Sequence, residues 1–267
     1  MIFHTDHDTA IPETIRNDGI LYTGKEETSL DNRFIRTAAL LGEEAMERLA
    51  ACHVAVFGLG GVGSWCAETL ARSGVGKLTL IDRDIVNESN INRQLIALSS
   101  TVGKPKAELM AERVHDINPA CSVKAVTGTY DAEHRDAFFA DYDYVADAID
   151  LVSCTLDLIC TCLERGIPVI SALGTGNKLD PTLLRVSDIA KTENDALARV
   201  VRKELRARGI LHTTVVWSPE LPLEARQFEA PDPGRRSVPG SLPWVPSSAG
   251  LLMCSHIVKD LTGKNEK

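Results

Sequence analysis

Residues 52–82 read CHVAVFGLGGVGSWCAETLARSGVGKLTLID, and this stretch decides the fold. Its first six residues form an apolar run typical of a buried strand, and the glycine-rich turn of residues 58–63 follows. A helical pattern then covers residues 64–73. Residues 77–81 form a second apolar strand that Asp82 closes. Strand, helix and strand within about 30 residues predict a parallel crossover unit.

The same alternation continues along the chain. Further helices are expected at 33–50, 106–117, 132–139, 155–164, 196–207 and 247–261, and further strands at 122–126, 144–149, 167–171 and 182–186. Strands separated by helices indicate a mostly parallel sheet that helices cover on both faces. We therefore predict an α/β, Rossmann-like fold, followed by a C-terminal substrate or crossover region.

The composition excludes several classes of protein. Hydrophobic residues make up 44% of the 267 residues, enough for a buried core, yet no apolar run approaches the roughly 18 residues of a membrane span. The N-terminus is acidic, unlike a secretory signal. Seven scattered cysteines without a C-x-x-C pair argue against a disulfide scaffold and against zinc. We expect a reducing, cytoplasmic setting, and the net charge of −8 still allows a local basic surface.

The turn Gly58-x-Gly60-x-x-Gly63 stands where a strand meets a helix. Glycines there let a phosphate approach the backbone, and the start of the helix supplies N–H groups and partial positive charge. Asp82 follows Gly58 by 24 residues, in position to accept hydrogen bonds from ribose hydroxyls. The alternatives are a tight turn without a ligand and a capping or salt-bridged aspartate. Alone, these features favour a nicotinamide-linked oxidoreductase.

The polar residues that follow favour ATP instead. Asp84, Asn90, Arg93 and Lys106 form a polar and cationic series for which a dinucleotide enzyme has no need. One charge pair at about 4 Å is worth roughly 4 kcal/mol at an effective dielectric of 20. Arg93 and Lys106 are therefore expected to neutralise the phosphates, and the charge that develops at phosphorus during adenylyl transfer.

Asp150 is the candidate metal ligand. It follows the apolar strand expected at 144–149, at a carboxyl end, where open sheets place ligands. A carboxylate among phosphates is repulsive unless a cation lies between them, so we predict that Asp150 binds Mg²⁺. The alternative is a helix N-cap for the segment after Leu151.

These residues together resemble the adenylating superfamily of ubiquitin-activating enzymes and their bacterial relatives. The resemblance runs from Arg33 to Ser171 and rests on Arg33-Phe34-x-Arg36, Gly58-x-Gly60-Gly61-x-Gly63-Ser64, Asp82-x-Asp84, Asn90-x-x-Arg93-Gln94, Lys106 and Asp147-x-x-Asp150. It implies that Asp82 binds the ribose and that Asn90, Arg93 and Lys106 bind the phosphates. It further implies that Arg36 reaches the phosphates of a neighbouring subunit in a homodimer, and that Arg36, Arg93, Lys106 and Asp150 are catalytic.

Further stretches resemble one branch of this superfamily, over nearly all of residues 32–262. They are Val62-Gly63-Ser64-Trp65, Ile117-Asn118-Pro119, Asp188-Ile189-Ala190-Lys191-Thr192 and Pro246-Ser247-Ser248-Ala249-Gly250. That branch uses ATP to activate the carboxylate of threonylcarbamoyladenosine at position 37 of tRNA, and the acyl group closes into a ring as AMP leaves. A cysteine desulfurase or sulfur acceptor is a further partner to consider.

Three rival functions remain open. The first is adenylation of the C-terminal glycine of a small sulfur-carrier or ubiquitin-like protein, the second a non-catalytic nucleotide sensor, and the third a redox enzyme. Because the nucleophile of the tRNA branch lies in its substrate, no catalytic thiolate is needed. The cysteines Cys154, Cys160, Cys162 and Cys254 are expected in the core or on helix faces.

The substrate side carries two weaker candidates. Four basic residues fall on one face of the helix expected at 196–207, namely Arg199, Arg202, Lys203 and Arg206. They are either a patch for tRNA phosphates or an ordinary solvated face. The turn of Gly174 and Gly176 follows a strand end, where its amides would hold the activated carboxyl oxygen or a monovalent cation, unless it is a plain loop. Lys178 and Asp180 lie close by.

These assignments divide the chain. Residues 1–31 form an acidic extension, with seven acids against Arg16 and Lys25. A single adenylating domain is expected over residues 32–267, with the nucleotide-binding core at 32–171. The remaining residues, 172–267, form the substrate side and contribute to the dimer. Within them, residues 219–246 hold seven of the twelve prolines and predict an ordered loop or a mobile lid.

Overall fold

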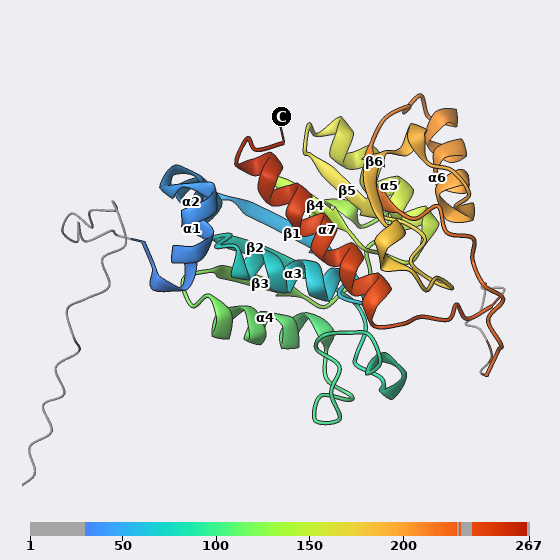
Figure 1. Ribbon diagram of the computed structural model, residues 1–267, viewed down its shortest axis with the longest axis horizontal. Coiled ribbons are helices and arrows are strands. Elements are labelled where there is room, and N and C mark those ends of the chain that lie inside the picture. Colours follow the sequence, from blue (N-terminus) through green and yellow to red (C-terminus); the bar gives the residue numbers. More distant parts are fainter. Residues whose placement is uncertain (1–29, 229, 231–236, 266–267) are drawn as a thin grey trace, which may run out of the picture.

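The computed structural model describes residues 30–228, 230 and 237–265, and it has the α/β fold that the sequence predicts (Figure 1). One seven-stranded sheet has the order β3-β2-β1-β4-β5-β7-β6, in which only the pairing of β6 with β7 is antiparallel among the described strands. The strands are β1 (His53–Phe57), β2 (Lys77–Ile81), β3 (Ser122–Val126), β4 (Tyr144–Asp147), β5 (Val169–Ala172), β6 (Arg185–Asp188) and β7 (Thr214–Trp217).

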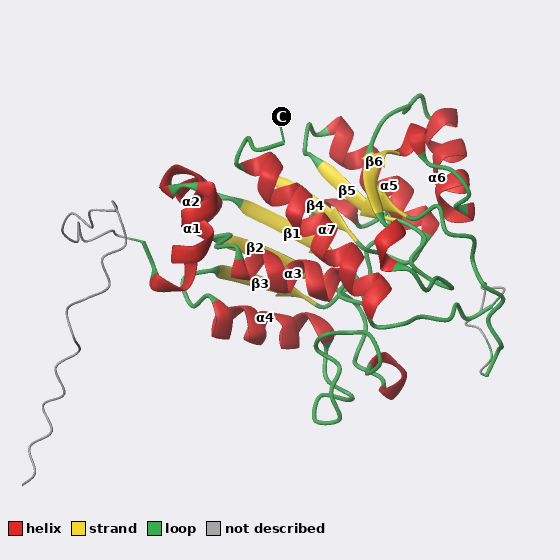
Figure 2. Cartoon of the chain, in the orientation of Figure 1, coloured by secondary structure: helices red, strands yellow, loops and turns green. Residues whose placement is uncertain are grey.

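Helices cover both faces of this sheet (Figure 2). The α-helices are α1 (Ile35–Leu41), α2 (Glu43–Ala51), α3 (Gly63–Arg72), α4 (Lys106–Ile117), α5 (Val152–Glu164), α6 (Ala196–Ala207) and α7 (Trp244–Leu261). The 3₁₀ helices are η1 (Asn32–Phe34), η2 (Glu88–Asn90), η3 (Arg135–Phe138), η4 (Pro181–Leu183) and η5 (Ile189–Lys191). Among the residues described, no helix has the length and apolar character that crossing a membrane requires.

The alternation of side chains along each strand builds a core on either face of the sheet. Val54 and Val56 of β1 pack with α2, α3, α4 and α7. Ala55 and Phe57, which point the other way, pack with α5. Strand β7, between β5 and the edge strand β6, is buried against α5 and α6 in the same manner, through Val215 and Trp217. Both faces are apolar, as a mostly parallel sheet requires.

Several element boundaries differ from the prediction. The helix expected at 33–50 is divided into η1, α1 and α2, because Gly42 adopts a φ of 88° between α1 and α2. The helix expected at 132–139 is the short 3₁₀ turn η3. The strand expected at 182–186 begins at Arg185, because Pro181 opens η4 instead. Strand β7 was not predicted, although its Thr-Val-Val-Trp run is typical of a strand.

The N-terminal extension and the proline-rich loop are only partly covered. Of residues 1–31, the structure describes Leu30 and Asp31, so the predicted extension lies outside the described residues. The loop predicted at 219–246 extends to Pro243, and its last three residues belong to α7. Residues 229 and 231–236 of the loop lie outside the described part.

The centre of the sheet contains the switch point at which parallel sheets bind ligands. The chain runs outwards from β1 through β2 to β3, then returns to the other side of β1 as β4. Phe57 and Asp147, the last residues of β1 and β4, are partners in the register of the two strands. Loops that leave such a pair of strands part from each other and open a crevice beyond their carboxyl ends. The glycine turn and Asp150 both belong to these loops.

Candidate nucleotide-binding site

Packing within the protein requires two of the glycines in the turn. Gly58 has a φ of 85°, and a β-carbon there would stand 2.6 Å from the carbonyl oxygen of Ala148. A β-carbon on Gly63 would stand 1.8 Å from the carbonyl oxygen of Gly58. These two residues bring the turn against itself and against the loop that follows β4, which any larger side chain would prevent.

Gly60 differs, because the protein itself leaves room beside it, whereas Gly61 is closely packed. A β-carbon on Gly60 would meet only the amide nitrogen of Gln94, at 3.8 Å, which is ordinary contact. One on Gly61 would stand 3.2 Å from Pro246 and 3.4 Å from the stem of Arg93. Neither glycine has a positive φ. The fold therefore has little need of a glycine at 60, whereas a phosphate approaching the backbone has one.

Asp82 holds the glycine turn and the next loop together. One carboxylate oxygen accepts a hydrogen bond from the backbone N–H of Leu59 at 2.6 Å, and the other accepts from that of Asp84 at 2.8 Å. Neither the helix cap nor the salt bridge considered for Asp82 is present among the described contacts. The acid instead tightens the loops at the position where a ribose would lie beside it.

Lys106 lies at the start of α4 and is almost completely buried. Its ammonium group lies 3.2 Å from a carboxylate oxygen of Asp84. The backbone N–H of Lys106 also donates to the carbonyl of Asp84, at 3.0 Å. The predicted cofactor residues Lys106 and Asp84 are thus brought together as a pair, next to Asp82.

The segment that carries Arg93 is fixed to the first turn of α3. The Ser64 hydroxyl donates to the carbonyl of Gly60 at 2.6 Å and accepts from the N–H of Leu95 at 3.2 Å. The Trp65 indole donates to the carbonyl of Arg93 at 3.3 Å. Ser64 and Trp65, which the sequence identified only through a resemblance, therefore set the position of Arg93 relative to the glycine turn.

Asn90 and Arg93 come from one short loop. Asn90 is buried, and its side-chain oxygen accepts from the N–H of Asn87 at 3.2 Å, which caps η2. The Nη1 of Arg93 donates to the carbonyl of Ser89 at 2.8 Å and to the side-chain oxygen of Asn92 at 2.9 Å. Asn92 was not singled out from the sequence, where nothing but its place before Arg93 marks it.

On the β4 side, the strand ends two residues earlier than predicted. Asp147 turns the chain, because its carboxylate accepts from the N–H of Ile149 at 3.1 Å. Its second carboxylate oxygen is buried with no hydrogen-bond partner within the described structure, and burial raises the pKa of Asp147 to about 6. The N-cap of α5 is Leu151, so the exposed Asp150 precedes it in the loop rather than capping the helix.

The chemistry around Asp150 fits magnesium held jointly with a nucleotide. Within the described ranges there is no cluster of three or more His, Cys, Asp or Glu side chains that could hold a metal by itself. Mg²⁺ needs no such cage, because it is usually bound by one or two carboxylates, substrate phosphates and water. Asp150 is an exposed carboxylate at the carboxyl edge of the sheet and can serve as such a ligand.

Arg36 lies away from the site that its own chain forms. It is exposed on α1, and α2 then leads directly into the first residue of β1. Figure 1 shows α1 and α2 at the end of the sheet where β1 begins, whereas the glycine turn follows the last residue of β1. Arg36 is thus placed at the amino end of the sheet, and Arg93 at the carboxyl end.

The turn that contains Gly174 and Gly176 is built on a buried ion pair. The ammonium of Lys178 donates to Asp195 and to the carbonyl of Ser218, both at 2.7 Å, and both ionic side chains are buried. Gly174 has a φ of 56°, and a β-carbon there would stand 1.9 Å from a carboxylate oxygen of Asp195. The protein's own packing therefore explains Gly174, and Lys178 acts as its support.

The basic helix α6 presents three of its four predicted residues to solvent. Arg199, Lys203 and Arg206 are exposed. Arg202 is half-buried and differs from them, because its guanidinium donates to the Thr192 carbonyl at 2.8 Å and also contacts the Thr192 hydroxyl. The face is thus smaller than the sequence predicts, and Arg202 joins α6 to η5.

The cysteines lie where the sequence predicts. Cys154, Cys162 and Cys254 are buried, and Cys160 is half-buried on α5. Burial raises the pKa of Cys154, Cys160 and Cys254, and that of Cys162 to about 12. Thiols of this kind are poor nucleophiles at neutral pH.

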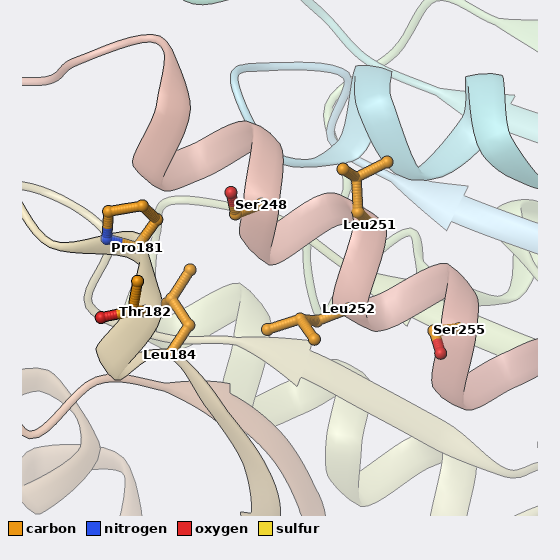
Figure 3. A pocket seen from close by; sticks show the side chains of 7 residues that line it. All are labelled: Pro181, Thr182, Leu184, Ser248, Leu251, Leu252 and Ser255. Atoms are coloured by element: carbon orange, nitrogen blue, oxygen red, sulfur yellow. The ribbon is translucent and has the colours of Figure 1, made fainter.

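A cavity of about 470 Å³ lies outside this constellation, between η4 and α7 (Figure 3). Its walls are Pro181, Thr182, Leu184, Ser248, Leu251, Leu252 and Ser255, which include no titratable side chain. The groups that can bind a nucleotide therefore gather at the switch point, and not around this cavity.

Comparisons with known proteins identify the family of the chain. Residues 32–267 match the ThiF family. The tRNA threonylcarbamoyladenosine dehydratase of Bacillus subtilis is 45% identical over 241 residues, which cover 86% of this chain and 94% of that protein. The enzyme of the same name from Escherichia coli is 38% identical over 252 residues, with 87% and 94% covered.

A solved structure is similar in fold as well. The crystal structure of the E. coli tRNA N6-threonylcarbamoyladenosine dehydratase, TcdA, in complex with ATP superposes with a TM-score of 0.78 at 39% identity. The match covers 87% of this chain and 95% of that one.

Proposed function

This chain belongs to the ThiF family, and we propose on that premise that it activates the carboxylate of threonylcarbamoyladenosine at position 37 of tRNA with ATP and closes it into a ring. The observation that carries the proposal is the glycine turn at the switch point. Gly58 and Gly63 are glycines because of packing, whereas a β-carbon on Gly60 would meet only ordinary contact, at 3.8 Å from the side chain of Gln94.

The reaction has two steps. A carboxylate oxygen of the substrate attacks the α-phosphorus of ATP, the bond to the β-phosphate oxygen breaks, and pyrophosphate leaves with that electron pair. A nucleophilic atom of the same modified base then attacks the acyl carbon and releases its proton to the solvent, and AMP leaves with the former carboxylate oxygen. The net loss from the nucleoside is one molecule of water. The protein need not supply a nucleophile, which agrees with its buried and half-buried thiols.

Electrostatics is the main task of the protein in the first step. Charge on the phosphates grows and shifts as pyrophosphate leaves, and prepositioned cations stabilise it most effectively in a site that excludes water. Arg93 is fixed by Ser89 and Asn92, and Lys106 by Asp84, before any nucleotide arrives. In this proposal Asp82 binds the ribose, the amides of Gly60 and Gly61 meet the phosphates, and Asn90 supports the loop.

Mg²⁺ would be held by Asp150 together with phosphate oxygens, and it would neutralise charge on them as pyrophosphate leaves. The exposed position of Asp150 beyond β4 supports this role. A dimer would supply the remaining cation. In this dimer Arg36 serves a neighbouring subunit's phosphates, as the family resemblance implies, and its place at the opposite end of its own sheet supports that role.

The tRNA is expected to meet the exposed basic face of α6. Arg199, Lys203 and Arg206 present three positive charges there, which suits contact with the nucleic-acid backbone. The turn of Gly174 and Gly176 lies nearer the sheet, since it follows β5 and rests on Asp195, the N-cap of α6. This connection supports an acyl side that lies between the tRNA surface and the nucleotide.

Two assays test the function. In a pyrophosphate-exchange assay, tRNA bearing threonylcarbamoyladenosine should stimulate exchange, whereas a sulfur-carrier protein with a C-terminal glycine should not. Mass spectrometry of nucleosides from the treated tRNA should show the product lighter by one water. Exchange that depends on the carrier protein alone would transfer the chain to the sulfur-carrier branch. ATP binding without AMP release would leave only a sensor.

A further inference from the structure

Two asparagines from opposite sides of the site hold one segment of chain between them. This segment, residues 237–243, leads into α7 and is called the return segment below. Asn177 binds it from the turn after β5, and Asn92 binds it from the loop that carries Arg93. In the reaction proposed above, Asn92 only helps to fix Arg93, and Asn177 has no part.

Asn177 grips the return segment with both its backbone and its side chain. Its N–H donates to the carbonyl of Gly240 at 2.7 Å, and its side-chain oxygen accepts from the N–H of Gly240 at 2.6 Å. Its own carbonyl accepts from the N–H of Leu223 at 2.8 Å. Asn177 also has a φ of 60°, a conformation that asparagine tolerates better than most residues. The turn that contains Gly174 and Gly176 is called the acyl-side turn below. Asn177 thus joins this turn to the proline-rich loop at two points, Leu223 and Gly240.

Asn92 connects the same segment to the phosphate side. Its side-chain nitrogen donates to the carbonyl of Ser241 at 2.9 Å. Its side-chain oxygen accepts from Nη1 of Arg93 at 2.9 Å. A planar amide that makes both bonds couples the orientation of the guanidinium to the position of Ser241.

We propose that Asn92 is a positioning residue for Arg93, and that the hydrogen-bonded chain from Arg93 through Asn92, Ser241, Gly240 and Asn177 couples nucleotide binding to the ordering of the acyl-side turn. The coupling rests on the proposed function, in which Arg93 meets the phosphates. It goes further, because it assigns a task to Asn92, a variable position of a nucleotide motif, and to Asn177, which lies outside these motifs.

The geometry of the guanidinium supports this role. Nη1 carries two hydrogens, and the carbonyl of Ser89 and the side chain of Asn92 accept them. Both hydrogens of Nη1 are thus used within the protein, and they fix the plane of the guanidinium. A phosphate that binds the guanidinium in this plane keeps Nη1 on Asn92. The amide of Asn92 is then fixed as the donor to Ser241.

Steric contacts reinforce the chain. A β-carbon on Gly176 would stand 3.0 Å from Pro239 of the return segment. Gly61 lies between the stem of Arg93 and Pro246, and Pro246 belongs to the first turn of α7. The Trp244 indole also donates to the carbonyl of Leu179 at 2.7 Å. The return segment and the start of α7 thus contact the nucleotide turn on one side and the acyl-side turn on the other.

Hydrogen exchange tests the coupling without relying on turnover. We expect ATP with Mg²⁺ to slow amide exchange in residues 237–243 by roughly five-fold, which is the typical contribution of one hydrogen bond to an opening equilibrium. Asn92→Asp keeps the acceptor for Arg93 but loses the donor to Ser241. This variant should bind ATP and yet show no slowing of exchange in the return segment.

Asn177 supplies a matched pair of variants. Asn177→Gly accepts the positive φ and keeps both backbone bonds, but it lacks the side-chain acceptor for Gly240. Coupling is reciprocal, so its looser return segment should weaken ATP binding by a similar factor of roughly five. Asn177→Asp retains an acceptor and should restore ATP affinity. Circular dichroism and unfolding curves confirm that each variant is folded.

The outcomes separate this inference from the proposed function. ATP binding to the wild-type protein with unchanged exchange in residues 237–243 would overturn the coupling and leave the function intact. Faster exchange in Asn177→Gly, with an ATP affinity equal to that of the wild type, would also overturn the coupling and leave the function intact. A wild-type protein that binds no ATP would overturn both.

Discussion

Gly63 lies so close to Gly58 that a β-carbon on Gly63 would stand 1.8 Å from the Gly58 carbonyl oxygen. Gly60, three residues earlier, has no comparable neighbour in the protein. The same glycine motif therefore contains residues required by packing and one whose surroundings leave space for a ligand. The contrast between Gly63 and Gly60 separates folding from binding.

Alanine substitution should separate these two roles. Gly63→Ala forces the backbone of the turn apart and should lower the free energy of unfolding by about 3 kcal/mol or more, since overpacking alone costs roughly 1–3 kcal/mol. Gly60→Ala should unfold like the wild type and bind ATP at least ten-fold more weakly. Urea denaturation and equilibrium ATP binding measure the two effects. Equal ATP affinity in Gly60→Ala and the wild type would contradict the placement of phosphate against Gly60.

The roles of Arg93 and Asp150 can be tested by removing their charge. Arg93→Ala and Asp150→Ala should each slow pyrophosphate formation roughly 30- to 1,000-fold, the usual effect of removing one charged group that stabilises the transition state by about 2–4 kcal/mol. Arg48→Ala serves as the control, because it removes an arginine that pairs with Glu44 on the surface of α2. Near-normal rates in the first two variants would refute their assignment.

Asp147 predicts a distinctive pH dependence of stability. Burial raises its pKa from 3.8 to about 6, so between these values the folded protein holds the proton more tightly than the unfolded chain. The contribution of Asp147 to stability therefore falls as pH rises through this window, by an amount on the order of 3 kcal/mol. Asp147→Asn has no such titration.

Unfolding curves of both proteins between pH 4 and pH 7 give the measurement for Asp147. The wild type should lose stability relative to Asp147→Asn as pH rises. A difference between the two proteins that stays constant with pH would show that the carboxyl group is already charged in the fold at pH 4.

The exposed basic face of α6 predicts how tRNA affinity depends on salt concentration. Arg199→Glu combined with Arg206→Glu should weaken tRNA binding and flatten the dependence of log affinity on log salt, by about 0.7–0.9 for each tRNA phosphate that the variant no longer neutralises. Arg202 is left unchanged, because its contacts with Thr192 serve the fold. ATP affinity should not change. If tRNA affinity at several salt concentrations also stays unchanged, α6 is an ordinary solvated helix.

The ion pair beneath the acyl-side turn should be essential to stability. Lys178→Met leaves Asp195 buried without its cation and should destabilise the protein by about 3–5 kcal/mol. Adding Asp195→Asn to this variant removes the stranded charge and keeps an N-cap for α6, so the double variant should recover part of the loss. Thermal unfolding of Lys178→Met and of the double variant measures this recovery of stability. A double variant no more stable than Lys178→Met would mean that packing, rather than charge, causes the loss.

Local pattern in the sequence was sufficient to predict most of the sheet, most of the helices that cover it and several residues at the switch point, but it missed β7. A strand, a glycine turn and a helix are each short-range, and their order along the chain places Gly58, Asp82 and Asp150 at carboxyl ends of strands. The spacing of apolar residues and the residue types that favour turns carry this information without reference to distant residues. The bound ATP in the similar E. coli structure agrees with the choice of nucleotide.

Only the tertiary structure decided which residue serves packing and which is left for a ligand. Gly60 and Gly63 look alike in sequence, and they differ because Gly58 and the loop after β4 surround one of them alone. Lys178 and Asp195, Arg202 and Thr192, and Asn92 and Ser241 are likewise pairs whose partners lie 10–149 residues apart. No local pattern encodes such contacts, because their strength depends on burial and on the geometry that the completed fold supplies.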